Sequence, residues 1–341
     1  MFKHEPVSTE TKNLTETTMT DAVRQWIRQH AHPLTTLAPH DPLADLAALH
    51  GLARDATVVA LAASARQTHE LSAIAHRMLR FLVEEMGFRS IALEGDDAAR
   101  LHLDEFVRTG RGDPQALLAD ARSFWQTEEI VDVIRWMRAH NERHPHDQVR
   151  FAGVPDRAPL RPGNPQTVGD DIEQRLAENT IWWHEHTGDK IVYWGGLAHM
   201  VNGSTRTVSP PSPPPTHRNA GSYLRERFGS GYLCIGLTFH HGSLPYPVPA
   251  PPPDFAEAPL GDAGLDSFFL NLHAPGPASV RAWLNTPTRT RLIGPVYDPG
   301  DDAAHHLSGG SLAGWMDVIA HHRQVTPVRV ISGEGRVGRL G

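Results

Sequence analysis

Short apolar runs alternate with amphipathic stretches along the first two thirds of the chain. Continuous apolar or β-branched runs occupy residues 57–61, 90–93, 149–152, 190–194 and 232–239. Runs of this length without polar alternation are typical of strands that are buried on both faces of a parallel sheet. Residues 68–86 lie between the first two runs and place apolar side chains at helical spacing, namely Leu71, Ile74, Met78, Leu79, Leu82 and Val83. Gly87 follows this stretch and predicts the end of the helix.

The same spacing predicts further helices between the other runs. They cover residues 113–121, 127–141 and 222–228, a segment through Leu176 and Ile181, and a first helix that starts at Asp21. Strands that alternate with helices predict an α/β fold, with a central, mainly parallel sheet flanked by helices. Residues 1–20 are predicted to be a flexible tail, and 21–341 a single domain with a helical excursion at about 95–147.

The second half of the chain is less regular. Residues 205–219 and 245–253 are rich in proline, which predicts irregular loops that could act as lids. Residues 266–272, 291–296 and 318–319 are predicted to add strands to the sheet.

Composition excludes several classes of function. Of the 341 residues, 40% are hydrophobic and 21% are charged, which is typical of a globular protein. The net charge of -7 argues against a nucleic-acid partner. No apolar stretch approaches the ~20 residues that cross a bilayer, so no membrane partner is expected. The single cysteine, Cys234, fits a reducing compartment, and we expect a cytoplasmic protein.

Common cofactor motifs are missing from the sequence. The 22 histidines include no HExxH pattern, and there is no CxxC pair, so no metal site is predicted. The stretch GEGRVG at residues 333–338 matches GxGxxG, but no helix can follow it before residue 341. Neither GxSxG nor the phosphate-binding GxxxxGK occurs. We therefore expect no cofactor.

Ionisable side chains follow several of the predicted strands. Arg66 and, one turn later, His69 follow the first strand, Glu94 follows the second, and His199 and His240 follow later ones. Ligands of open parallel sheets bind at the carboxyl ends of the strands. We therefore expect these side chains to line an active site.

Several longer blocks of the sequence resemble the erythromycin esterase family. Between about Thr57 and Pro327 they are VVALAASARQTHE, HRMLRFLVEEMGFRSIALEG, FWQTEEIVDVIRWMRAHN, FAGVPD, KIVYWGGLAHMVNG, GSYLRERFGSGYLCIGLTFHHG and WMDVIAHHRQVTP. Their order and approximate spacing carry the resemblance. It implies an α/β fold and a metal-independent esterase that opens macrolide lactones. In that family a histidine base activates water, helped by glutamates and an arginine.

The family's catalytic pattern is changed in this chain. Ala63 stands at the glutamate position of the family's GExxH and Arg66 at its histidine position. In the family's HNxxH, the first histidine becomes Gly196 and the second is kept as His199. The glutamate after the second strand is kept as Glu94. The resemblance therefore implies that Glu94 and His199 are the acid/base residues that remain.

Other positions are candidates for substrate binding. The family's arginine on the first long helix falls on or near Ala75, where His76 or Arg77 could replace it. Trp125 and Glu129 match a helical block of the family. With Arg66, His69 and His240, these residues form the predicted substrate-binding set. Alternatives are open, because Trp125 fits a core position equally well and His69 and His76 fit an exposed helix face.

Arg66 determines which chemistry the sequence allows. An arginine keeps its proton, so Arg66 cannot replace the missing histidine base. It can bind a carboxylate, a phosphate or a developing oxyanion, and it would favour the ionised form of Glu94 if the two approach. His199 can shuttle a proton near neutral pH. The alternative is structural, with Glu94 paired to Arg66 and His199 capping a helix.

These residues lead to one main hypothesis and two alternatives. The main hypothesis is an enzyme of bacterial secondary metabolism that performs elimination or cyclisation on an apolar, polyketide-like small molecule. The alternatives are a metal-independent ester or lactone hydrolase that uses His69 or His76 as its base, and a catalytically silent binding protein for such a compound.

Overall fold

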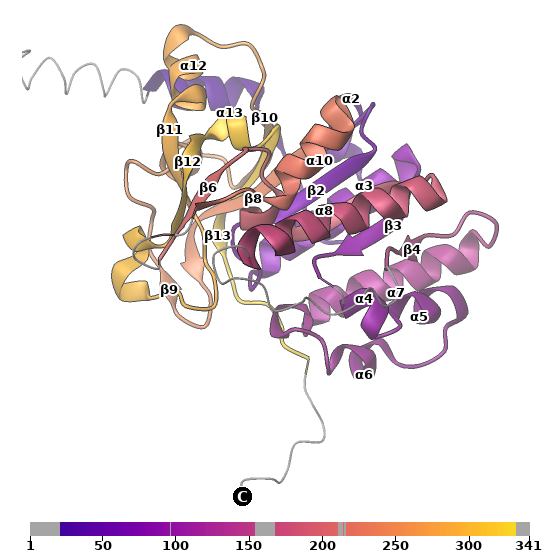
Figure 1. Ribbon diagram of the computed structural model, residues 1–341. Helices are drawn as coiled ribbons and strands as arrows, with labels where there is room; N and C mark the ends of the chain where they lie inside the picture. Colours follow the sequence, from indigo (N-terminus) through magenta and orange to yellow (C-terminus); the bar gives the residue numbers. More distant parts are fainter. Residues whose placement is uncertain (1–20, 96, 154–167, 211–213, 215, 332–341) are drawn as a thin grey trace, which may run out of the picture.

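The computed structural model describes residues 21–95, 97–153, 168–210, 214 and 216–331 (Figure 1). The predicted tail at 1–20 and the GEGRVG stretch lie outside the described residues. Within the described residues, the strands form one nine-stranded sheet and one four-stranded sheet.

The large sheet is mainly parallel. Its order is β1 (His32–Pro33), β10 (Ser267–Asn271), β13 (Val318–Val325), β8 (Tyr232–Ser243), β2 (Val58–Ala63), β5 (Lys190–Gly196), β3 (Phe88–Leu93) and β4 (Arg150–Phe151). Neighbours from β13 to β4 pair in parallel, whereas β1, β10 and the short β9 (Pro247–Val248) pair antiparallel. The predicted α/β fold with a central sheet flanked by helices is confirmed.

Strand β2 lies in the middle of the sheet and divides the apolar interior into two layers. All six of its side chains are buried. Val59, Leu61 and Ala63 belong to one apolar cluster, and the alternate residues Val58, Ala60 and Ala62 belong to the other. Successive side chains of a strand point to opposite faces, so a fully apolar strand requires helices on both sides.

The helices on the two faces come from different parts of the chain. The first cluster packs α3 (His69–Met86) and α7 (Glu128–Arg143) against the sheet. On the other face lie α8 (Val168–Thr187) and α10 (Ala220–Phe228) (Figure 1). The short helix α9 (Leu197–Met200) packs into the same apolar cluster. The predicted apolar stripe of α3 is buried, and Gly87 ends this helix in the left-handed conformation with φ 73°. That conformation favours glycine because it has no Cβ.

The remaining helices are short. Between β3 and β4 lie α4 (Asp97–Arg100), α5 (Leu103–Thr109) and α6 (Pro114–Leu118), followed by α7. Others are a helix at 21–30, α2 (Leu49–Leu52), α11 (Glu257–Gly261), α12 (Ala278–Asn285) and α13 (Leu312–Trp315). Short 3₁₀ helices cover Ala44–Leu46, Ser123–Trp125, Gly229–Gly231 and Pro299–Ala304.

The small sheet corrects two sequence predictions. Its order is β11 (Pro287–Arg291), β12 (His306–Ser311), β6 (Arg206–Ser209) and β7 (Thr216–His217). The predicted loop at 205–219 therefore contains two strands of this sheet, the interior strand β6 and the edge strand β7. The predicted strand at 291–296 is wrong, because β11 ends at Arg291 and the chain then turns at Gly294, whose carbonyl accepts the Tyr297 N–H at 3.2 Å.

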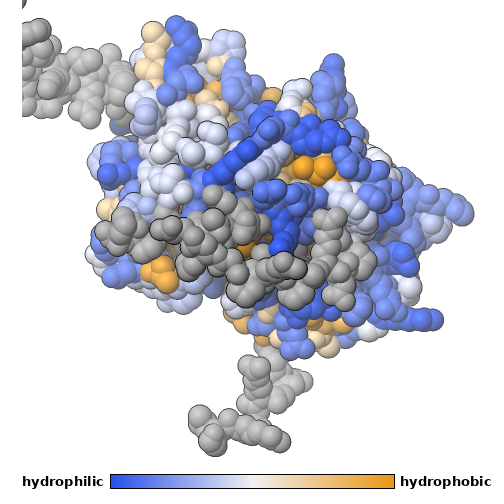
Figure 2. Space-filling model, viewed as in Figure 1, coloured by the Kyte–Doolittle hydropathy of each residue, from blue (hydrophilic) through white to orange (hydrophobic). Residues whose placement is uncertain are grey.

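The face seen in Figure 2 is mainly hydrophilic over α8 and α10. Across the described part of the chain, the strongly exposed large apolar side chains are Val296 and Val330, which are far apart in sequence. None of the helices in the described part is long and apolar enough to cross a membrane.

Candidate active site

Glu94 lies at the carboxyl edge of the sheet, directly after β3. Its N–H donates to the Trp194 carbonyl at 2.9 Å, which extends the pairing of β3 with β5 by one residue. The side chain is 6% exposed. Oε2 accepts the Gly196 N–H at 2.7 Å and contacts the Arg66 guanidinium, and Oε1 lies 3.5 Å from His199 Nε2. The ends of β2, β3 and β5 thus bring Arg66, Glu94 and His199 together.

Arg66 fills space that a side chain at position 196 would need. Its guanidinium lies 4.3 Å from the centre of the Phe124 ring and contacts Glu94. A Cβ on Gly196 would lie 2.4 Å from Arg66 Nη2, which is too close for contact between non-bonded atoms. The glycine therefore makes room for the arginine.

Glu173, on α8, holds His199 from the other side. Its Oε1 lies 2.7 Å from His199 Nδ1 and accepts a hydrogen bond of 2.6 Å from Arg206 Nη2. Its Oε2 accepts the Ala220 N–H at 2.9 Å. Glu173 and Arg206 are 4% and 5% exposed, while the His199 ring is 27% exposed. The imidazole is therefore held at Nδ1 by Glu173 and lies near Glu94 at Nε2, and part of the ring is exposed to a ligand.

The electrostatics of the site favour an ion pair. Burial alone would lower the pKa of His199, but the charges of Glu94 and Glu173 and the hydrogen bond to Glu173 outweigh it and raise that pKa above 6.5. Burial alone would raise the pKa of Glu94, but the charges of His199 and Arg66 and the Gly196 N–H hold it below its usual value. Both shifts favour an imidazolium beside a carboxylate over the neutral pair.

This arrangement can donate a proton and accept another. The His199 imidazolium is a general acid, and the Glu94 carboxylate is the base beside it. A neutral histidine base that activates water would require the opposite resting state of His199. The geometry is therefore suited to acid/base chemistry in which His199 donates a proton and Glu94 accepts one.

His69 and Glu129, two of the predicted substrate-binding residues, contact each other. His69 Nδ1 lies 2.7 Å from Glu129 Oε1, and the charge and hydrogen bond of this buried carboxylate raise the pKa of His69 against the opposing effect of burial. Glu129 also accepts the Arg329 N–H. Trp125 is buried, lies edge-on to the Trp194 ring at 6.3 Å, and lines a small hollow with Arg66.

The other two predicted residues lie elsewhere. His76 is buried beneath the rings of His40 and Trp136, and burial lowers its pKa to about 3. The alternative that His76 lies on an exposed helix face is therefore wrong. His240, on β8, lies beside His241 and Gly261. In the described part of the chain, the recorded contacts bring neither His76 nor His240 to Glu94 or His199.

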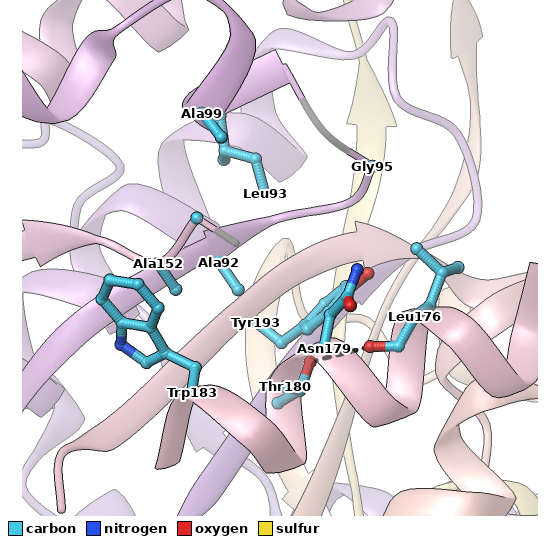
Figure 3. A pocket seen from close by; sticks show the side chains of 11 residues that line it. Ala92, Leu93, Gly95, Ala99, Ala152, Leu176, Asn179, Thr180, Trp183 and Tyr193 are labelled. Carbon is cyan, nitrogen blue, oxygen red and sulfur yellow. Dashed lines mark hydrogen bonds between the residues drawn. The ribbon is translucent and has the colours of Figure 1, made fainter. Parts of the chain in front are cut away.

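Several site residues were missed by the sequence reasoning. Glu173 and Arg206 lie far along the chain from Glu94 and in no motif, so no sequence signal marks them. Tyr193 looked like a core residue of β5. Its ring lines a cavity of about 60 Å³ that lies between α8 and the ends of β3, β4 and β5 (Figure 3). Within the described residues, no three His, Cys, Asp or Glu side chains gather as metal ligands would.

Comparison with known proteins identifies the family of this chain. The sequence model of the erythromycin esterase family matches residues 83–157 and 164–325. Erythromycin esterase type II of Escherichia coli is 25% identical over 130 residues, which are 38% of this chain and 30% of that protein. The putative hydrolase YbfO of Bacillus subtilis strain 168 is 26% identical over 123 residues, 35% of this chain and 26% of that protein. The matched stretches thus span less than a third of either curated relative.

Solved structures share the fold over most of the chain. A succinoglycan biosynthesis protein has a TM-score of 0.77 at 20% identity, covering 93% of this chain and 99% of that structure. A Bacillus cereus protein has a TM-score of 0.78 at 20% identity, with 91% and 99% covered. A mutant of the erythromycin esterase EreC in its open conformation has a TM-score of 0.60 at 14% identity, with 87% and 98% covered. With a family match over most of its length and this shared fold, the chain belongs to the erythromycin esterase family.

Proposed function

We propose that this protein is an acid/base enzyme that eliminates water, or closes a ring, in a neutral small molecule bearing a carbonyl group. The observation that supports the proposal is the position of His199 between two buried carboxylates, whose charges favour the protonated imidazole. The loss of the family's histidine base at position 66 supports it as well.

For elimination, the proposed step begins at a carbon next to the carbonyl. Glu94 removes a proton from that carbon, the electron pair of the broken C–H bond forms a carbon–carbon double bond, and the C–O bond to the β-hydroxyl breaks. His199 donates its proton to the departing oxygen, so that water leaves. Glu94 is then protonated and His199 is neutral, and the separation of 3.5 Å between Glu94 Oε1 and His199 Nε2 suits return of the proton.

Arg66 and Glu173 have supporting roles in this proposal. The Arg66 guanidinium would stabilise negative charge that develops on the carbonyl oxygen as the proton leaves. Glu173 positions the imidazole through Nδ1, which leaves Nε2 as the nitrogen that donates the proton. Acid and base groups placed in this way each contribute ~10²-fold to 10⁴-fold in rate.

The proposed substrate is apolar and polyketide-like, and the proposed setting is bacterial secondary metabolism. The proposal for the substrate is supported by Ala63, Trp125 and Phe124 around the small hollow beside Arg66. These apolar side chains would contact the hydrocarbon part of a substrate, and they could not pair with a charged group on it.

The test is mass spectrometry of products from a panel of β-hydroxy ketones, β-hydroxy esters and macrolide lactones. We expect loss of one water from a β-hydroxy carbonyl compound, and loss of this activity in Glu94→Gln and His199→Ala. Glu178→Gln is the matched control, because Glu178 lies on α8 but is exposed and contacts only Gln174 among the recorded partners. Binding of panel compounds with no product in any variant would instead indicate a silent binding protein.

A second candidate function is ester or lactone hydrolysis with His69 as the base. The observation that favours it is the His69–Glu129 pair, because a carboxylate that orients one imidazole nitrogen leaves the other available to activate water. Products that gain one water, and that are lost in His69→Ala but kept in His199→Ala, would establish this function and contradict the elimination proposal.

A further inference from the structure

The cavity beside Tyr193 is lined by polar as well as apolar side chains, unlike a simple packing defect in an apolar core. Its walls include the apolar side chains of Leu93, Leu176 and Trp183 and the polar side chains of Asn179 and Tyr193 (Figure 3). A volume of about 60 Å³ is enough for a few water molecules or one hydroxymethyl-sized group, but too small for a whole ring.

Two residues that line this cavity each have a buried polar atom without a partner. Tyr193 is 2% exposed, and neither its hydroxyl nor Asn179 Oδ1 has a hydrogen-bond partner among the described residues. Buried hydroxyl and amide groups are nearly always paired, because leaving one unpaired is costly. Tyr232 illustrates the usual case, because its equally buried hydroxyl donates to the Met200 carbonyl at 2.6 Å.

The unpaired atoms define the chemistry of a ligand. Asn179 Oδ1 only accepts, so the ligand atom must donate a hydrogen bond. The Tyr193 hydroxyl can donate to the same atom if that atom also accepts. An alcohol oxygen does both, and its carbon fits the apolar walls. A carboxylate does not fit, because it cannot donate to Asn179.

The charges around Tyr193 also disfavour an anion. Burial raises the pKa of Tyr193 most, and the negative charges of Glu94 and Glu173 raise it further, against the opposing charges of Arg66 and Arg122. The Tyr193 ring also borders the candidate active site. A Cβ built on Gly195 would lie 2.9 Å from Glu94 Oε2 and 3.0 Å from Tyr193 Cε1, so the carboxylate and the ring both border this glycine.

We infer that the cavity is a subsite for an uncharged hydroxyl group of the ligand, held between Tyr193 and Asn179 next to Glu94. The identification of that ligand as the substrate rests on the proposed function. The substrate would then carry a hydroxyl group a few atoms from its reacting centre, in addition to any hydroxyl that is eliminated.

The test is ¹⁹F NMR of protein in which the five tyrosines are replaced by 3-fluorotyrosine, with Tyr193→Phe and Tyr232→Phe used to assign two of the signals. Ethylene glycol is the probe, acetate is the anionic control, and acetonitrile is the control that only accepts. We expect ethylene glycol to shift the Tyr193 signal saturably and to leave the Tyr232 signal unchanged. Asn179→Leu should weaken this binding about fivefold to tenfold.

The inference would be overturned if acetate or acetonitrile bound with the same affinity as ethylene glycol. It would also be overturned if the Tyr193 signal did not respond to ethylene glycol. Equal affinity in the Asn179→Leu variant would also overturn it. The measurement needs no turnover, so its failure leaves the acid/base proposal standing. Conversely, an inactive Glu94→Gln variant that still binds ethylene glycol would support the subsite, whether or not the acid/base proposal holds.

Discussion

Glu173→Gln should destabilise the protein, and more so at acidic than at alkaline pH. The carboxylate of Glu173 contacts His199 Nδ1 at 2.7 Å and Arg206 Nη2 at 2.6 Å in a buried setting. A hydrogen bond to a charged group contributes about 1.5–3 kcal/mol, and the glutamine oxygen can replace part of each. We therefore expect a loss of about 2–4 kcal/mol in the free energy of unfolding.

The pH dependence follows from the raised pKa of His199. A histidine whose pKa is raised by folding contributes stability that is fully present below its unfolded pKa, and that is lost as the pH rises through the folded pKa. Removing the charge of Glu173 lowers the folded pKa and so removes part of this stability. The contact with Arg206 contributes at every pH. The loss should therefore be larger at about pH 6 than at about pH 9.

The assay is urea unfolding of the wild type, Glu173→Gln and the control Glu178→Gln at both pH values. Glu178 is exposed on the same helix, so its substitution should change stability by less than about 0.5 kcal/mol. A Glu173→Gln loss that is equal at the two pH values would refute the charge assigned to His199. A loss no larger than that of the control would refute the network as a whole.

Three further predictions test separate parts of the structure. Gly196→Ala should displace the flexible Arg66 side chain at a cost of about 1 kcal/mol or less, but should abolish product formation; an unchanged rate would show that the position of Arg66 does not matter. Tyr193→Phe should leave stability unchanged or raise it because the hydroxyl has no partner, whereas Tyr232→Phe should lower it by about 1 kcal/mol; thermal unfolding that shows equal losses would contradict this difference. Burial holds the pKa of His76 at about 3 in the folded protein. Below about pH 6.5 the unfolded state binds a proton at His76 that the folded state does not, so the folded protein loses stability as the pH falls. His76→Gln should make acid unfolding shallower by up to about 1.4 kcal/mol per pH unit, and an unchanged slope would mean that His76 is protonated in the native state.

The parallel centre of the large sheet could be predicted from the sequence because β2, β3 and β5 are buried on both faces and the helices α3 and α7 are long and amphipathic. The small sheet could not. Its strand β12 is HLSGGS and β7 has two residues, so their pairing depends on neighbours that are distant in sequence. Local patterns carry no information about such contacts.

The candidate site was predictable only where a residue follows a strand. Arg66, Glu94 and His199 do so, and the parallel sheet brings them to one edge. Glu173 reaches His199 from the first half of α8, 26 residues earlier in the chain, and it is buried on a helix whose other side chains are largely polar. Tyr193 belongs to a strand of buried residues, and only the structure reveals that its hydroxyl lacks a partner.

The central claim is that His199 rests as an imidazolium beside an ionised Glu94. The most direct measurement is the pKa of His199 by NMR titration, with His199→Gln used to assign its signal, in the wild type and in Glu94→Gln. The account predicts a pKa above 6.5 in the wild type and a lower one in the variant, because the charge of Glu94 is the largest influence that raises it. A wild-type pKa below 6.5, or one that Glu94→Gln leaves unchanged, would contradict the account.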